Sequence, residues 1–445
     1  MRVVKIVIVA LALALVVTGA SAATPVTIGP TLTAKIALPS DYDDIAQIIG
    51  SGTSWLVVGN IDKSTILTST LFPKEASIGE SDGYVAMLDP ALHLVWSHRF
   101  GTSHDDVATA IARDSAGIIW SVGVTTKEVQ PAPISTSTET TPTTAPTLSP
   151  ATPVPTANPD GVVPVTLPTA PAVADQLLIS SWSSAGQLLS QSLHTIADGI
   201  AINPSTVIAA KSGIYVVGTA VDALAGTSRG FYVHVAKDGS MGPIHWIGLR
   251  SVVLRTAALL RNGSLVVGGS IAEALKGKRA VGLVDAFVAV VNPTTGSVLR
   301  TQRSGDKSAT RSWESLSVDR FGDLMVIGLS QVGVKSQVVA TSFSSKGAVR
   351  FSLRFANPLG TQVALTGPVG AFTSIALAST RPRRSGREAY LLPIASNGRL
   401  LAPTYLVGKA AGSGLVAAAI GRGYLLAVSE ASGLTLAWFA PRIGK

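Results

Sequence analysis

The residue types that most often carry out chemistry are sparse in this chain and lack their usual spacing. The six histidines all stand before residue 246, and none lies four residues from another, as zinc ligands on one face of a helix do. Cysteine is absent, which excludes disulfides, thiolate metal sites and a lipid on an N-terminal cysteine. We therefore expect neither a metal ion nor a cofactor.

Two short strings match known motifs. Residues 226–230, GTSRG, fit G-x-S-x-G, the turn that exposes a nucleophilic serine in α/β hydrolases. Residues 412–414, GSG, resemble the start of a dinucleotide-binding loop. Both lie among short strand-like segments, without the strand-to-helix turn or βαβ unit that each motif needs, so we assign neither as a site.

Charged residues that could bind a partner gather in a few segments. Four arginines stand close together: Arg381, Arg383, Arg384 and Arg387. Two pairs of adjacent aspartates occur earlier: Asp43 with Asp44, and Asp105 with Asp106. Guanidinium groups suit an anionic ligand, so we predict a ligand-binding set from these residues. The alternative is that the aspartates accept hydrogen bonds from local amides and the arginines are only solvated.

The composition is that of many short strands joined by turns. Of the 445 residues, 47% are hydrophobic, 14% are charged and 43 are glycine, and valine, threonine and isoleucine recur in short runs. Lysine and arginine exceed aspartate and glutamate by nine. The excess is about seven if an N-terminal segment that contains Arg2 and Lys5 is cleaved off. Because this surplus is spread along the chain, it suits an anionic polymer or surface better than a nucleic acid.

A repeated phrase organises the chain. Residues 82–123 divide into four strand-like pieces separated by turn residues, and residues 230–270 and 285–329 repeat the pattern. Fainter copies start at residues 175, 335 and 387. Each unit holds two hairpins with glycine in their turns, and four such strands cannot bury both faces alone. The sequence thus predicts an all-β protein, a β-propeller of about seven four-stranded blades.

The two ends of the chain complete each other in this scheme. The last unit, residues 414–441, supplies three strands, and the alignment of residues 32–50 with 93–112 makes Ala34 to Leu38 an outer strand. Pairing that strand with the final three closes the ring and hides its edges. We expect residues 23–445 to form a single propeller domain whose last blade is closed by the N-terminal strand.

The phrase DGYVAMLDP…WSHRFG…DDVATAIARDSAGIIWSVG, residues 82–123, resembles the bacterial β-propeller repeats often called SBBP repeats, found in exported proteins. The resemblance covers nearly all of the chain after the leader and is best at 82–123 and 285–329. The units from residue 359 onward lack the Asp-Phe/Tyr-Val-Ala opening. The resemblance implies a propeller and export, and it carries no catalytic residues.

Two segments stand outside the repeat. Residues 1–22 combine a basic start, an apolar run and Ala20-Ser21-Ala22, the pattern of a cleaved secretory signal, with an uncut membrane anchor as the alternative. Residues 129–172 hold 11 prolines, many threonines and two charges, which predicts a disordered insert within the second blade. It is either a bare spacer or an O-glycosylated stalk.

Together these features favour a non-catalytic, secreted or cell-surface propeller, monomeric and without a membrane span once its signal is removed. We expect it to bind a protein or an anionic cell-envelope polymer, and no nucleic acid, through its loop-rich face. In a propeller, that face carries the loops from second to third strand and from blade to blade. The alternative is a hydrolase or lyase with polar residues converging at the mouth of the central channel. Inner segments such as VATAIA, residues 107–112, predict a channel lined by small residues, which favours binding.

Overall fold

The computed structural model describes residues 30–38, 45–62, 75–126, 173–319, 321–357, 363–365, 372–380, 387–395, 397–400, 404–405, 415–420, 423–430 and 433–441. Every regular element in these residues is a β-strand, which confirms the all-β prediction. No described segment is a helix long and apolar enough to cross a bilayer. The predicted signal, residues 1–22, and the predicted insert, residues 129–172, lie outside the described residues.

The described strands form seven four-stranded antiparallel sheets. The first strands are β2 (Ile45–Ser51), β6 (Asp106–Arg113), β10 (Ala201–Ala210), β14 (Val252–Leu259), β18 (Thr310–Val318), β22 (Val363–Leu365) and β26 (Leu415–Ile420). The second strands are β3 (Ser54–Asp62), β7 (Ile119–Thr125), β11 (Gly213–Asp222), β15 (Leu265–Ile271), β19 (Leu324–Val332), β23 (Phe372–Thr380) and β27 (Gly423–Glu430).

The outer half of each sheet follows the same order. The third strands are β4 (Ser81–Leu88), β8 (Gln176–Trp182), β12 (Thr227–Ala236), β16 (Asp285–Val291), β20 (Lys335–Phe343), β24 (Arg387–Ala395) and β28 (Gly433–Pro441). The fourth strands are β5 (Leu94–Phe100), β9 (Leu188–Thr195), β13 (His245–Ile247), β17 (Val298–Ser304), β21 (Val349–Asn357), β25 (Thr404–Tyr405) and, beside β28, β1 (Pro30–Leu38).

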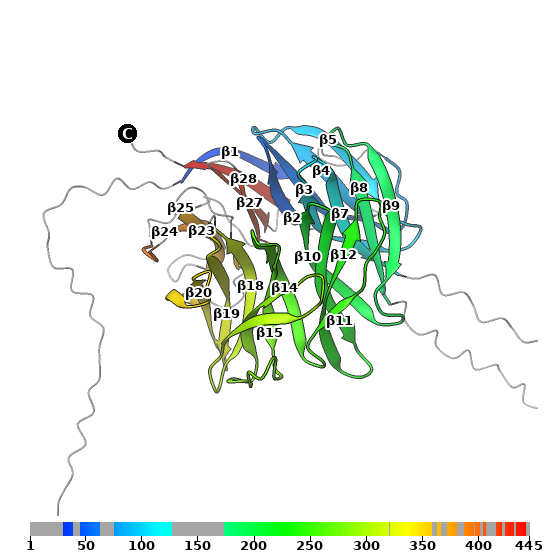
Figure 1. Ribbon diagram of the computed structural model, residues 1–445. Helices are drawn as coiled ribbons and strands as arrows, with labels where there is room; N and C mark the ends of the chain where they lie inside the picture. Colours follow the sequence, from blue (N-terminus) through cyan, green and yellow to red (C-terminus); the bar gives the residue numbers. More distant parts are fainter. Residues whose placement is uncertain are drawn as a thin grey trace, which may run out of the picture.

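The sheets surround a common centre, with first strands such as β2, β10 and β14 toward the middle and fourth strands such as β5 and β9 at the rim (Figure 1). Each first strand contacts the next in the order β2, β6, β10, β14, β18, β22 and β26, and β26 contacts β2. Short antiparallel sheets that radiate from an axis in this way make a β-propeller.

Separate apolar clusters fill the spaces between neighbouring sheets, because alternate side chains of each strand face opposite neighbours. Trp55 packs with Leu425 between the first and last sheets, and Trp182 packs between the sheets of β2–β5 and β6–β9. Trp313 fills the space between the sheets of β14–β17 and β18–β21. Each large apolar side chain buried in this way contributes about 1.5–3 kcal/mol, so the sheets stabilise one another.

The first strands of five sheets carry a β-bulge at corresponding places. The bulged residues are Ala46, Thr109, Ser205, Arg255 and Glu314. The hydroxyls of Thr109 and Ser205 donate to the carbonyls of Val122 and Val217 on the second strand, at 3.2 and 3.3 Å. Because a bulge bends its strand and re-aims one side chain, the repeat gives these sheets a similar bend beside the axis.

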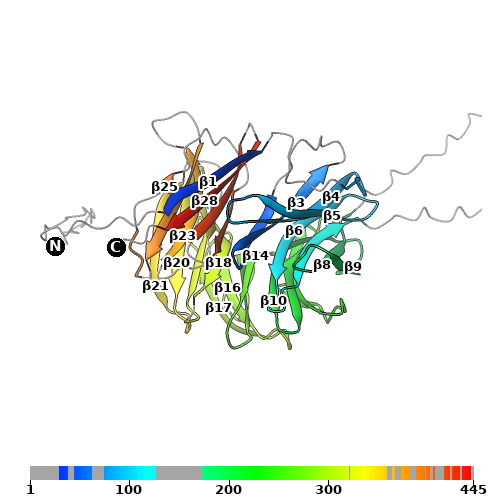
Figure 2. The same cartoon turned by 90° about the horizontal axis from the view of Figure 1, so that it is seen from above.

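Strand β1 lies beside β28, with Pro30 opposite Pro441 and Leu38 opposite Leu434 (Figure 2). This sheet takes one strand from the start of the described chain and three from its end, in the order β1-β28-β27-β26. Strand β28 therefore has a hydrogen-bonded neighbour on each side, and its backbone groups do not form an open edge.

Candidate binding face

One face of the ring carries the longer connections. Because the four strands of a sheet alternate in direction, the connections from second to third strand and from each sheet to the next lie at the same side. We call this side the loop-bearing face, and the side with the first-to-second and third-to-fourth turns the turn face. Of the predicted site residues, the structure describes Asp105 and Asp106, where the first sheet leads into the second, and Arg387 at the start of β24, and these positions belong to the loop-bearing face.

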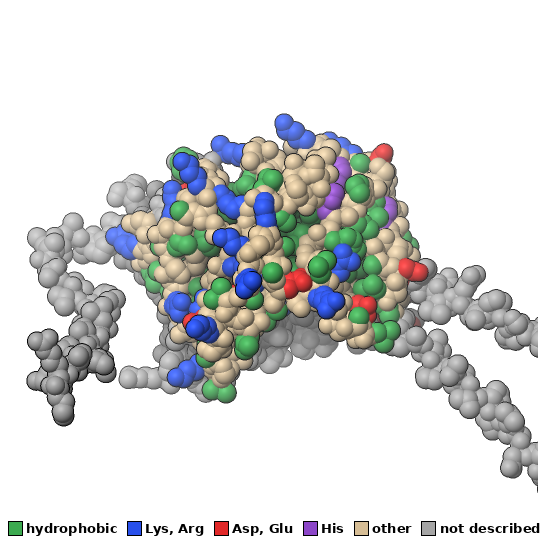
Figure 3. Space-filling view, turned by 60° about the horizontal axis from the view of Figure 1, so that its bottom comes forward, with side chains coloured by type: hydrophobic (Ala, Val, Ile, Leu, Met, Phe, Trp, Pro, Cys, Tyr) green, Lys and Arg blue, Asp and Glu red, His purple; other side chains and the backbone are tan. Residues whose placement is uncertain are grey.

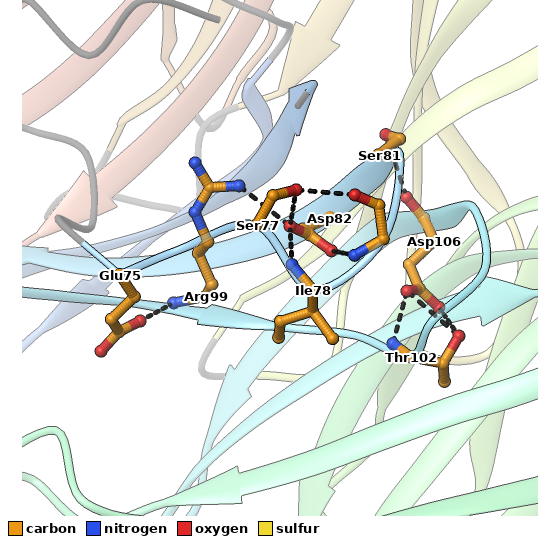
Figure 4. Close-up of polar contacts among 9 residues, drawn as sticks. Glu75, Ser77, Ile78, Ser81, Asp82, Arg99, Thr102 and Asp106 are labelled. Carbon is orange, nitrogen blue, oxygen red and sulfur yellow. Dashed lines mark hydrogen bonds and ion pairs between the residues drawn. The ribbon is translucent and has the colours of Figure 1, made fainter. Parts of the chain in front are cut away.

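A buried aspartate anchors this face in the first sheet (Figure 4). The Asp82 carboxylate, fully buried at the start of β4, accepts the backbone N–H groups of Ile78 and Gly79 at 2.9 and 2.8 Å. It also forms an ion pair at 2.9 Å with Nη1 of Arg99 on β5. Burying a carboxylate is tolerable only when it is paired and hydrogen-bonded, and both conditions hold here. Asp82 thus fixes the end of the long β3–β4 connection against the outer strand.

Asp106 belongs to the same corner and has a structural role. Its carboxylate is fully buried and accepts the backbone N–H of Thr102 at 2.6 Å (Figure 4). The Thr102 hydroxyl lies 3.2 Å from the Asp106 carboxylate and 3.0 Å from the Thr125 hydroxyl. Burial raises the pKa of Asp106 above its ordinary value. The Asp106 carboxylate closes the connection between two sheets, as the alternative interpretation of the aspartates expects, and its neighbour Asp105 is exposed.

The fourth sheet repeats the first. Asp285 at the start of β16 is fully buried, accepts the N–H of Gly282 at 2.7 Å and pairs with Nε of Arg303 at 2.9 Å. The register explains the repeat, since Arg99 lies opposite Tyr84 and Arg303 lies opposite Phe287, in each case two residues after the aspartate. In the third sheet, the position of this aspartate is taken by Arg229, because Trp246 lies opposite Phe231, two residues further on. The Arg229 guanidinium lies 4.2 Å from the ring centre of Trp246.

The fifth sheet keeps the arginine and loses the carboxylate. Arg354 lies opposite Val339, so the register puts Gln337 where Asp82 and Asp285 stand in their sheets. Arg354 is exposed, and it lies near Arg311, which is buried at the start of β18. Burial lowers the pKa of Arg311, and the positive charge of Arg354 lowers it further. Two cations thus stand near one another at this corner, where Arg311 also lies 3.7 Å from a carboxylate oxygen of Asp306.

Basic charge is concentrated on two neighbouring sheets. Residues 251–357, which span β14 to β21, contain fourteen lysines and arginines against six aspartates and glutamates, a surplus of eight beside nine for the whole chain. The surplus is therefore not spread along the chain, as the composition suggested. Lysine and arginine far outnumber aspartate and glutamate on the surface drawn in Figure 3.

The acidic groups of these sheets have partners, while several cations do not. Asp285, Asp323 and Glu314 form ion pairs with Arg303, Arg350 and Arg255. On the loop-bearing face of these two sheets, the side chains of five exposed cations form no hydrogen bond or ion pair with a described residue: Lys278, Arg279, Lys307, Lys335 and Arg354. We call these five residues the basic arc. They were not among the predicted site residues, because they are separated in the sequence and do not form a run like Arg381 to Arg387.

The structure describes only one residue of the predicted arginine segment. Arg381, Arg383 and Arg384 lie outside the described residues, as do Asp43 and Asp44. Arg387 begins β24, and its backbone lies opposite Thr380. Strands β23 and β24 are the second and third strands of the sheet next to β18–β21, so Arg387 stands at the loop-bearing face.

A cavity of about 490 Å³ opens at the rim between the first two sheets. His98 lies there between Trp96 and Trp182, with ring centres 5.8 Å away on each side, and its Nδ1 is 2.7 Å from a carboxylate oxygen of Glu75. The indole N–H of Trp182 donates to Ser121 at 3.0 Å, which fixes that ring. No sequence pattern predicted this cavity, because its walls come from the β3–β4 connection, β5 and the β8–β9 turn.

The first strands carry little that could do acid–base chemistry. Away from their ends, their charged residues are Arg255 and Glu314, whose Nε and Oε2 atoms lie 3.4 Å apart and join β14 to β18. In the described part of the chain, no three histidine, aspartate or glutamate residues cluster closely enough to hold a metal ion. The GTSRG string lies in the β11–β12 hairpin, where Ser228 pairs with Val221.

No protein-family model and no curated protein sequence matches the chain. Similar solved structures include the β-propeller domain of Myceliophteria thermophila Cps50 (Swd1), 9% identical, with a TM-score of 0.48 over 92% of this chain and 99% of that one. Chaetomium thermophilum Sqt1 is 11% identical, with a TM-score of 0.44 over 92% and 98%. The polysaccharide lyase Uly1 is 10% identical, with a TM-score of 0.48 over 89% and 90%. At these identities the likeness concerns the fold alone, and the SBBP resemblance stays a prediction.

Proposed function

We propose that this chain is an exported, non-catalytic binding propeller that holds an anionic cell-envelope polymer on its loop-bearing face. One observation carries the proposal: five exposed cations without partners stand on that face of two adjacent sheets. A polymer with repeated negative charges can meet several of them at once, and each contact releases counterions from the polymer. The arginines at 381–387 would extend the same surface into the next sheet.

The shape of the face supports this choice of partner. Cations distributed over two neighbouring sheets suit an extended polyanion better than a single small anion, which would need convergent donors in a pocket. An acidic protein surface offers the same charge in a less regular pattern, and it is the second candidate partner.

The proposed scaffold is a single ring of seven blades, closed by β1. The pairing of β1 with β28 and the contact of β26 with β2 support closure. Closure gives the face a fixed curvature, so its cations would be held in place before a partner arrives. Export rests on the signal-like pattern of residues 1–22 and on the resemblance to repeats of exported proteins.

The alternative class, a hydrolase or lyase acting at the channel mouth, would require an acid and a base near one another. The Arg255–Glu314 pair is the charged group that the middles of the first strands offer. Glu314 is also held by the hydroxyl of Ser312, so its carboxylate is already occupied by two neighbours. This arrangement favours a structural pair and supports the binding proposal over the catalytic one.

The test measures retention on an anionic polysaccharide such as alginate, with neutral dextran as the comparison matrix. A variant with Lys278→Ser, Lys307→Ser and Arg354→Ser removes three cations of the basic arc. We expect its affinity to fall about tenfold or more at low salt, and the slope of log affinity against log salt to fall by roughly one for each lost contact. Arg383→Ser with Arg384→Ser tests the predicted arginine segment in the same way.

The matched control removes cations from the same two sheets at the opposite face. Arg261 lies in the β14–β15 turn and Lys346 in the β20–β21 turn, both on the turn face. Changing both to serine alters the net charge of these sheets without touching the basic arc. Equal losses in the control and arc variants would refute a localised binding face, and retention by none of the proteins would refute the polymer as partner.

A further inference from the structure

Among the described fourth strands, β9 differs from the other long ones in how its outer edge is protected. A fourth strand leaves a row of backbone N–H and C=O groups unpaired on its outer side, and proteins protect such edges with charges or covering segments. On β5, the Glu75 carboxylate accepts the backbone N–H of Arg99 at 2.6 Å. On β17, Lys276 Nζ donates to the carbonyl of Val298 and, at 2.8 Å, to that of Leu299.

Charge also protects β21, which carries Arg350 and Arg354. Strand β9 has neither device. Its sequence, LLSQSLHT, contains no lysine, arginine, aspartate or glutamate, and it is eight residues long. Leu188, Leu189 and Leu193 are 46, 51 and 45% exposed on it. Among the described residues, its backbone hydrogen bonds run to β8 alone.

We propose that β9 pairs with the β9 strand of a second copy of this chain, in place of the monomer expected from the sequence. An antiparallel pair related by a two-fold axis would join the two four-stranded sheets into one of eight strands. With the axis at Gln191, Leu189 of one copy stands opposite Leu193 of the other. The edge is thus complementary to itself, because Leu189 and Leu193 meet on both sides of the axis and the strand has no lysine, arginine, aspartate or glutamate that could repel its copy.

The distribution of charge favours a second copy at this position. The basic arc belongs to the sheets of β14–β17 and β18–β21, which lie two and three sheets further round the ring from that of β9. In Figure 1, β9 stands at the right-hand rim and β19 and β20 stand on the left. Two copies joined at β9 therefore keep their cations far apart, whereas pairing through β21 would set arginines of both copies against each other. The proposal does not depend on the polymer-binding function.

The first experiment compares the molar mass of the purified full chain in solution with that of two variants, over a wide range of concentration. The proposal expects the wild type to show twice the mass of one chain. Leu189→Lys places a lysine of each copy opposite Leu193 of the other, and this variant should show the mass of a single chain. The control is Leu224→Lys, since Leu224 is fully exposed in the β11–β12 connection, and it should keep the doubled mass.

A second experiment reports the register directly. The chain has no cysteine, so Gln191→Cys alone should yield a covalent dimer on mild oxidation, while Ser297→Cys in the β16–β17 turn should not. Thermal unfolding of each variant shows whether it is folded. A wild type that stays monomeric at every concentration, or a folded Leu189→Lys variant that keeps the doubled mass, overturns the proposal. Open-ended assemblies larger than a dimer overturn it as well, because two-fold pairing closes on itself.

Discussion

Asp82 and Asp285 each hold two parts of the molecule together, because one carboxylate serves both a backbone turn and an arginine on the neighbouring strand. Removing such a group would leave a buried guanidinium without its partner, which costs about 3–5 kcal/mol in comparable pairs. The sequence contained a usable signal for these pairs. Both aspartates open a repeat unit, and an arginine follows each of them by 17 or 18 residues.

Asp106 leads to a prediction about pH. Its pKa in the folded protein is raised above the ordinary value of 3.8, mainly by burial, so ionisation of this group opposes folding. Its favourable contribution to the free energy of unfolding is present below that value and is lost as the pH rises through its folded pKa. We expect Asp106→Asn, whose amide oxygen can still accept from Thr102, to gain stability relative to wild type as the pH is raised from 3.8 to neutrality.

Urea unfolding of both proteins across that pH range measures the effect. Asp105→Asn, at an exposed position beside it, serves as the control and should follow the wild type. Parallel pH profiles for wild type and Asp106→Asn would mean that burial does not perturb this carboxylate.

At the scale of elements, the hairpin turns were the most predictable part of the molecule. Gly117, Gly263 and Gly322 stand in predicted turns and adopt φ of 89°, 82° and 82°, where glycine pays no steric penalty. What the sequence could not predict is how neighbouring sheets meet. The stack of His98 between Trp96 and Trp182 depends on packing between two sheets, and no local pattern in β5 or β8 indicates it.

Gly186, in the β8–β9 turn, is both a turn glycine with positive φ and a contact between two sheets. Its φ is 87°, and a Cβ at this position would lie 2.7 Å from the Trp96 ring and 3.0 Å from Nε2 of His98. We expect Gly186→Ala to lower the free energy of unfolding by about 2–4 kcal/mol, since strained backbone adds to overpacking. Gly52→Ala is the matched control: its φ is 65° and nothing lies within 4 Å of the added atom. It should lose only about 1–2 kcal/mol, and equal losses in a urea titration would show that packing at the rim is loose.

At the scale of the whole molecule, the number of repeats predicted a ring, while the common face of its unpaired cations emerged only from the fold. Lys278, Lys307 and Arg354 are far apart in sequence, yet their segments share one face because the sheets alternate strand direction in the same way. Arg354 could have been singled out by the missing aspartate at Gln337, but only once the strand register was known.

The role of β1 is testable on the same scale. A chain that begins after Leu38 lacks the strand that pairs with β28, so β28 becomes an open edge. We expect this truncation to melt at a lower temperature and to aggregate, while a chain that begins at Pro30 behaves as the wild type. A synthetic peptide of residues 30–38 added during refolding should restore solubility. If the shortened chain melts at the same temperature as the wild type, β1 does not contribute to the stability of the ring.

Because Pro30 pairs with Pro441, the final sheet cannot form until the chain has been synthesised as far as Pro441. Contacts between such distant residues are slow to form, and the earlier blades expose apolar faces in the meantime. We expect this protein to leave the ribosome incompletely folded and to depend on chaperones until its end is released. If the chain is exported as we propose, that delay is useful, since a polypeptide that has not yet closed can still be threaded through a secretion channel.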